Sequence, residues 1–266
     1  RPVLRLRLGL CCAFRDQPIR FRTTTAAALQ RRPLRERTEK LRGIADDNLQ
    51  ALEDAIRWCA GHRIGAFRIN SQILPLRTHP DHRDTVRALD EEVAPRFRDV
   101  GRIAAELDVR LSFHPDQFVV LSAPDPRVLD SSLEEVESQA EIAEWVGADV
   151  VNVHGGGAYG DPDAALDRFA RAVDRLSDRA RARLTVENDD RVYGPEALLP
   201  LCRRTGIPLC YDIHHHRCHP DGLGVHDAAE AAWATWDREP LFHVSSPKEG
   251  WNGHRPERHH DMVSAG

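Results

Sequence analysis

Histidine and carboxylate side chains stand directly after short apolar runs at several places in this sequence. Imidazole and carboxylate ligands together suit Zn²⁺ or Mn²⁺, whereas a set made only of oxygen ligands suits Mg²⁺ or Ca²⁺. One catalytic ion with an open coordination position needs only about three protein ligands, so the pattern predicts a site for more than one divalent cation. The residues with this placement are His114, His154, Glu187, Asp212, His215 and His243.

A carboxylate can bridge two ions about 3.5–4 Å apart, the spacing used in two-metal hydrolysis of phosphodiesters. Glu187 is our candidate for this bridge. Such a cluster would polarise a phosphate and neutralise the leaving oxygen. Each residue alone has a structural explanation, as a hydrogen-bonded histidine or as a helix N-cap. Independent structural residues, however, need not fall at the same end of successive strands.

The elements that would position these residues are short apolar or β-branched runs that alternate with helical patterns. This alternation predicts a parallel sheet, and its length favours one TIM-type (β/α)8 barrel domain over residues 1–266. No Gly-x-Gly-x-x-Gly follows the first strand, which argues against a nucleotide-binding fold. We find no eighth strand and expect the barrel to lack its last strand and helix. The predicted strands are Leu4–Cys11, Gly65–Asn70, Val109–His114, Asp149–His154, Ala182–Glu187, Ile207–Asp212 and Pro240–Val244.

Amphipathic patterns between these runs predict helices. One pattern places Leu49, Leu52, Ile56 and Cys59 on a single face, and another does so over 129–143. Ser131, with a glutamate three residues later, predicts a capping box at the start of the second helix. Asp161 followed by Pro162 predicts the N-cap and first turn of a further helix.

Composition and charge narrow the class of protein. The six cysteines include no Cys-x-x-Cys, which argues against a zinc finger and against a secreted disulfide framework. No run approaches about 18 apolar residues, so we expect no membrane association. The net charge is −5, but the first 42 residues hold twelve basic and three acidic residues, a net +9. Such a segment can neutralise phosphates, although a solvated charged face explains it nearly as well.

Short motifs, in order and over almost the whole chain, resemble the UV damage endonuclease family, whose barrel is shared more distantly with apurinic/apyrimidinic endonuclease IV. Each string alone is weak, whereas the ordered set is specific. The strings are Gly9-Leu10-Cys11-Cys12, Ile19-Arg20-Phe21-Arg22-Thr23, Phe67-Arg68-Ile69, Thr78-His79-Pro80, His114-Pro115-Asp116-Gln117-Phe118, His154-Gly155-Gly156-Gly157-Ala158-Tyr159-Gly160, Glu187-Asn188-Asp189, Asp212-x-His214-His215 and His243-x-Ser245-Ser246.

The resemblance implies a cluster of up to three divalent ions, usually Mn²⁺, with Zn²⁺, Co²⁺ or Mg²⁺ as alternatives. Glu187 is shared between the first two ions and is expected to be catalytic, as is His79 as a phosphate contact or outer ligand. A solvent-exposed loop histidine is an equal explanation for His79. The implied ligand sets are His114, His154 and Glu187 for one ion, Glu187, Asp212 and His243 for a second, and His215, His259 and Asp261 for a third.

The resemblance also implies the substrate, which is duplex DNA with pyrimidine photoproducts or abasic sites, nicked on the 5′ side of the lesion. Gln117 and Phe118 match the pair that such enzymes insert where damaged bases leave the stack. Lys248 is a candidate phosphate contact in the loop after the seventh strand. We therefore expect a monomeric, cytoplasmic enzyme that associates with the nucleoid during repair.

Two departures from the family leave alternatives open. Members carry a further metal-binding glutamate on the last strand, and this sequence stops before any match. Some carry a modified lysine where this sequence has Leu241. One alternative is therefore a catalytically impaired damage-binding protein. Another is a sugar isomerase or epimerase of the xylose-isomerase-like barrels, which needs only one or two ions.

Overall fold

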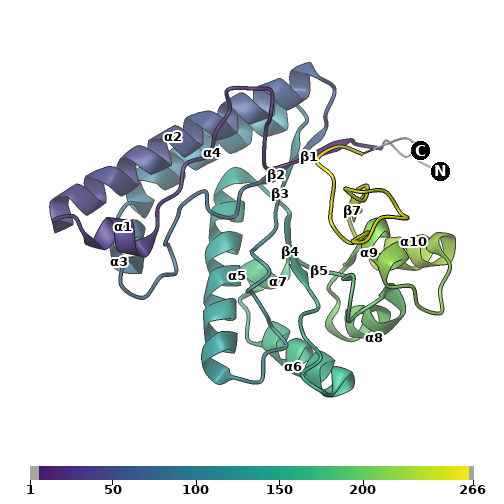
Figure 1. Cartoon of the computed structure of the whole chain (residues 1–266). Helices are drawn as coiled ribbons and strands as arrows, with labels where there is room; N and C mark the ends of the chain where they lie inside the picture. The colour runs from purple at the N-terminus through teal and green to yellow at the C-terminus, as the bar shows by residue number, and fades with distance from the viewer. Residues whose placement is uncertain (1–5, 264–266) are drawn as a thin grey trace. The chain divides into compact units, whose positions relative to one another are not determined.

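The computed structural model describes residues 6–263. Its strands form one parallel seven-stranded sheet whose order follows the sequence from β1 to β7 (Figure 1). This is the strand order of a TIM-type barrel, and within residues 6–263 no eighth strand follows, both as predicted. All seven predicted strands are present, although the Leu4 end of the first prediction lies outside the described residues. The strands are β1 (Gly9–Cys11), β2 (Ala66–Ile69), β3 (Arg110–Phe113), β4 (Val150–His154), β5 (Leu184–Glu187), β6 (Leu209–Asp212) and β7 (Phe242–His243).

The chain divides into two compact units. The first holds the described residues up to 116 together with 134–151, and the second holds 117–133 together with the described residues from 152 onward. That residues 1–266 form a single domain stays a prediction. No helix among residues 6–263 combines the length and the apolar character needed to cross a bilayer.

In the first unit, α2 (Leu34–Gly61) and α4 (Asp90–Glu106) lie alongside one another (Figure 1). The predicted face of α2 is confirmed, because Leu52, Ile56 and Cys59 are completely buried. Phe67 of β2 pairs with Leu111 of β3 in the parallel register. Both side chains are buried and belong to the core of this unit. The short helices of this unit are α1 (Ala26–Gln30) and α3 (Arg83–Arg87).

Helix α5 (Pro126–Val146) forms where the apolar period predicts it, but its predicted start is wrong. Ser131 lies inside the helix and is not the N-cap. The helix begins at Pro126, whose fixed φ suits a first turn. Asp125 precedes it, and its Oδ1 accepts the amide of Arg127 at 2.9 Å while its carbonyl accepts that of Leu129 at 3.0 Å. An aspartate followed by proline is the stronger start signal.

In the second unit, strands β5, β6 and β7 pair in parallel and are covered by short helices. The predicted N-cap of α6 is confirmed, because the Asp161 side chain accepts the amide of Ala164 at 3.0 Å. Leu184, Leu209 and Phe169 are completely buried and form part of its core. The helices are α6 (Pro162–Asp174), α7 (Asp178–Arg181), α8 (Pro195–Thr205), α9 (Ile213–Cys218) and α10 (Val225–Trp233).

Candidate metal centre

Four strands end on a predicted metal ligand that belongs to the second unit. His154, Glu187, Asp212 and His243 are the last residues of β4, β5, β6 and β7. Asp212 and His243 are register partners on neighbouring strands. Because parallel strands bring their carboxyl ends to one edge, the topology gathers these side chains at the edge where barrel active sites lie.

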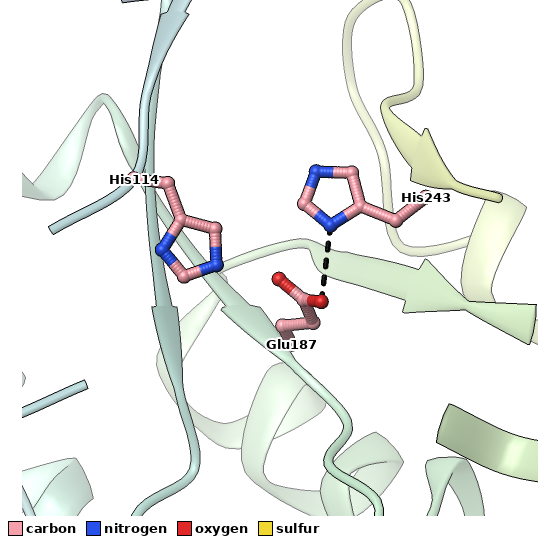
Figure 2. A group of neighbouring side chains, drawn as sticks. All are labelled: His114, Glu187 and His243. Carbon is pink, nitrogen blue, oxygen red and sulfur yellow. Dashed lines mark hydrogen bonds and ion pairs between the residues drawn. The ribbon is translucent and has the colours of Figure 1, made fainter. Parts of the chain in front are cut away.

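Glu187 lies at the centre of this group. Its side chain is buried, with the residue only 1% exposed. Oε1 lies 3.0 Å from Nδ1 of His243, the contact marked in Figure 2, and 3.5 Å from Nδ1 of His215. Oε2 accepts a hydrogen bond from the Asn152 amide. A buried carboxylate is unfavourable without partners, and these contacts hold its oxygens in place.

His154, Glu187 and His215 form a group suited to a metal ion. Each offers one ligand atom, and these atoms all lie within 4.8 Å of one another. Two imidazoles and a carboxylate are the donor set expected for Zn²⁺ or Mn²⁺. The residues present therefore fit a divalent cation on their chemistry and their separation.

The orientation of His215 is fixed by a backbone contact. Its Nδ1 lies 2.9 Å from the carbonyl oxygen of Asn188 and must donate to it, which directs Nε2 to the other side of the ring. There Nε2 of His215 lies 3.1 Å from Nε2 of His259. Two nitrogens each about 2.1 Å from a shared ion would be about 3.0–3.4 Å apart. The pair therefore has the spacing of two ligands of one ion.

Asp212 has a structural role that the sequence left open. Its Oδ1 accepts the amide of His215 at 2.8 Å and caps α9. Its Oδ2 lies 3.7 Å from Nδ1 of His215. Because Oδ1 is engaged in capping α9, Oδ2 is the oxygen that could bind an ion. The role of Asp212 as a metal ligand stays a prediction.

The electrostatics of β6 and β7 favour a proton on His243. Burial by itself lowers the pKa of His243, but the adjacent Cys210 and Glu187 raise it well above its usual value. Burial also raises the pKa of the Cys210 thiol. A histidine must be deprotonated at the ligating nitrogen to bind a metal, so a cation bound by His243 would displace a proton from its ring.

A hairpin-like loop, defined here as residues 246–260, carries His259. Pro247 and His259 form an antiparallel bridge, and the Lys248 amide donates to the carbonyl of Arg258 at 2.6 Å. The His260 amide donates to the carbonyl of Ser246 at 2.7 Å. The ends of the loop are therefore joined to each other, which holds His259 beside α9.

The centre of the same loop packs on α9. The buried His214 donates from Nε2 to the carbonyl of Pro256 at 2.8 Å. Its ring lies 5.0 Å from Trp251 and is stacked on His259 at 4.6 Å. The guanidinium carbon of Arg217 lies 3.7 Å from the centre of the Trp251 ring.

Sequence reasoning assigned no role to three residues that support this centre. Asn152 is held by the Thr185 hydroxyl at 2.7 Å and in turn holds Glu187. Asn188 orients His215, and His214 packs on His259. One feature of the sequence could have indicated Asn152. Asn152 and Thr185 are polar residues inside β4 and β5, where buried parallel strands usually carry apolar residues.

The other predicted site residues keep their sequence-based roles as predictions. His114 follows β3 and His79 follows β2, both in the first unit, so their parts in the site stay predictions. In the second unit, Phe118 is 77% exposed. The roles of the other exposed candidates also stay predictions, and these are Gln117, Lys248 and Asp261.

Comparisons with known proteins agree with the fold and the motifs. The family model described as UV-endonuclease UvdE matches residues 6–266. A UV DNA damage endonuclease of Bacillus velezensis is 34% identical over 237 residues, covering 85% of this chain and 72% of that protein. A crystal structure of SacUVDE has a TM-score of 0.86 at 26% identity, covering 98% of this chain and 86% of that one. Endonuclease IV from Thermus thermophilus has a TM-score of 0.58 at 24% identity, covering 79% and 76%, a likeness of fold alone.

Proposed function

Because the chain belongs to the UV-endonuclease UvdE family, we propose that it is a metal-dependent DNA repair endonuclease. It nicks the phosphodiester backbone of duplex DNA on the 5′ side of UV photoproducts, and also at abasic sites. The observation that carries this proposal is the buried Glu187, which has imidazoles of three histidines around it. The group of His154, Glu187 and His215, with His243 at 3.0 Å from Glu187, supports it.

The proposed cofactor is a cluster of divalent cations, with Mn²⁺ as the first choice and up to three ions. Bound cations supply Lewis acidity, which polarises the scissile phosphate and lowers the pKa of the attacking water. Glu187 is the residue that two ions would share, because this buried carboxylate has His243 beside one oxygen and a ligand atom of His154 within 4.8 Å. The pair of His215 and His259 would hold a third ion.

The protein's own residues would fix the geometry of the site. Asn152 holds one oxygen of Glu187, and Asn188 sets the ring of His215, so the ligands are oriented before a cation arrives. Outer partners of this kind typically contribute about 10–100-fold to metal affinity or activity. Damaged DNA would be recognised through its weakened stacking, with the exposed Phe118 entering the gap beside Gln117.

The direct test is nicking of UV-irradiated supercoiled plasmid by the purified full chain with added Mn²⁺. We expect conversion to the nicked circle, none with unirradiated plasmid, and loss of activity when a chelator is present. An end-labelled duplex with one photoproduct would map the cut to the 5′ side of the lesion. Binding to irradiated DNA without any nicking would contradict the proposal and favour a damage-binding protein.

A further inference from the structure

Tyr159 is an exposed aromatic residue in an unfavourable backbone conformation. Its φ is +52°, in the left-handed region that residues other than glycine rarely adopt, and the residue is 52% exposed. It lies in the glycine-rich loop that follows His154 at the end of β4. Strained backbone with an exposed ring persists only where the surroundings enforce it, and such positions cluster at functional sites.

The surroundings of Tyr159 hold its ring in one place. The ring packs over Gly157, where an added Cβ would lie 3.2 Å from its Cε2 atom. The guanidinium carbon of Arg168 lies 5.8 Å from the ring centre, within the range of a cation–π contact. Arg168 is itself fixed, since its Nε donates to the carbonyl of Ser122 at 2.8 Å.

This loop also packs against the segment that follows Phe118, in the same unit. The Ser122 hydroxyl donates to the carbonyl of Gly157 at 3.4 Å. At Gly156, whose φ is +86°, an added Cβ would lie 2.4 Å from Oγ of Ser122. The loop that carries Tyr159 is therefore in direct contact with the segment after Phe118, and Tyr159 and Phe118 are both exposed.

We propose that Tyr159 is a second aromatic contact for DNA, on which a nucleobase that has left the duplex stack comes to lie. This inference rests on the proposed function and names a residue that binds the same substrate. An exposed, rigid ring offers stacking area at little loss of conformational freedom, and base–aromatic stacking tolerates any base. The adjacent Arg168 places a positive charge where a negatively charged nucleotide would arrive.

The test compares Tyr159→Leu, which keeps an apolar side chain and the strained φ but has no ring, with Tyr159→Phe, which keeps the ring. Duplexes carry one tetrahydrofuran abasic analogue, with 2-aminopurine placed in turn at each neighbouring position, and a chelator prevents cutting. We expect wild type and Tyr159→Phe to quench one of these probes. Tyr159→Leu should lose that quenching and bind about fivefold to a hundredfold more weakly, the range for loss of one stacked base. Binding to undamaged duplex should not change.

Two further measurements separate stacking from a structural role. In nicking assays with Mn²⁺, Tyr159→Leu should raise KM while kcat changes little. Tyr159→Gly, which relieves the strained φ, should unfold at a temperature no lower than wild type yet share the weakened binding. Equal binding and quenching by Tyr159→Leu, in a preparation whose wild type nicks damaged DNA, would overturn this proposal alone. A wild type that neither binds nor nicks damaged DNA would overturn both proposals.

Discussion

Asn188 and Asp212 exchange two hydrogen bonds between the ends of β5 and β6. Nδ2 of Asn188 donates to the carbonyl oxygen of Asp212 at 2.9 Å, and the Asp212 amide donates to Oδ1 of Asn188 at 2.9 Å. Both residues are buried, with Asn188 completely inaccessible. The side chain of Asn188 thus satisfies the backbone amide and carbonyl of Asp212. The backbone carbonyl of Asn188 in turn orients His215.

Replacing Asn188 with alanine should lower both stability and activity. The change removes two buried hydrogen bonds and leaves the amide and carbonyl of Asp212 without partners. We expect the free energy of unfolding to fall by about 2–6 kcal/mol, because each of the two unsatisfied buried groups is unfavourable by about 1–3 kcal/mol. Denaturant titration measures this value, with the exposed Asn252→Ala as the matched control. A change no larger than the control's would show that the exchanged bonds contribute little.

Replacing Glu187 with glutamine should abolish nicking and leave the fold intact. Glutamine keeps the size of the side chain but removes the charge that two cations would share. Metal stabilisation of charge contributes several kcal/mol, so the rate should fall by more than about a hundredfold. The readouts are plasmid nicking and circular dichroism. Glu230→Gln changes an exposed carboxylate of α10 and should nick as wild type does. Near-normal nicking by Glu187→Gln would remove the bridging role.

Adding Mn²⁺ to metal-free protein should raise its unfolding temperature. A ligand present at about 100 times its Kd stabilises the native state by about 2.7 kcal/mol. The effect should be absent or much smaller in Glu187→Gln, because that variant lacks the central ligand. It should also weaken as pH is lowered, since protons compete for His243, whose pKa is raised by Cys210 and Glu187 against the opposing effect of burial. An equal rise of the unfolding temperature in wild type and in Glu187→Gln would show that Mn²⁺ binds at a site that does not include Glu187.

Asp221 gives a prediction for the dependence of stability on pH. Burial raises its pKa, but hydrogen bonds from the amides of Glu196 and Leu223 and from His216 outweigh this and lower it below the usual value. A depressed folded-state pKa means that the carboxylate stabilises the fold above its unfolded pKa, about 3.9. This contribution is lost as pH falls through the folded value.

Asp221→Asn should therefore be less stable than wild type at pH 7, by about 1–3 kcal/mol for hydrogen bonds to a charged group. The difference should shrink once the pH falls below about 4. Urea unfolding of both proteins across this range provides the measurement. A difference that stays constant with pH would show that the charge of Asp221 is not what stabilises the fold.

Replacing Phe118 with alanine should weaken discrimination between damaged and intact duplex. The exposed ring contributes little to the fold, so the unfolding temperature should stay near that of wild type. Loss of one wedge or stacking group corresponds to about 1–3 kcal/mol of lesion binding. Competition binding between lesion-containing and intact duplexes measures the preference. An unchanged ratio would contradict the wedge assignment.

Much of the fold could be predicted because its signals are local. Most strands are rich in apolar residues, and polar residues such as Glu187 and His243 mark strand ends. The helix start at Pro126 was missed because Ser131 and Glu134 gave a competing local pattern. Sequence spacing alone does not decide between two possible helix starts. The true start depends on which backbone amides the rest of the fold leaves without partners.

The detailed site could not be predicted to the same extent. The His215–His259 pair joins residues 44 positions apart, and nothing in the local sequence sets the approach of the two rings. The same holds for Asn152, which reaches Glu187 across neighbouring strands. The family resemblance supplied His259 and Asp261 as ligands, and the structure brings His259 to His215 while Asp261 is exposed.

The closed base of the loop formed by residues 246–260 has a consequence for protein engineering. The pairing of Lys248 with Arg258 and of Ser246 with His260 closes the loop at its base, and Trp251 and Pro256 hold its centre on α9. Between these two contacts, Asn252 and His254 are exposed. Lengthening a loop that is already closed adds little entropy loss. A short peptide tag inserted between Asn252 and His254 should leave these backbone pairs at the base of the loop intact. It would give a labelling position from which the approach of DNA could be followed.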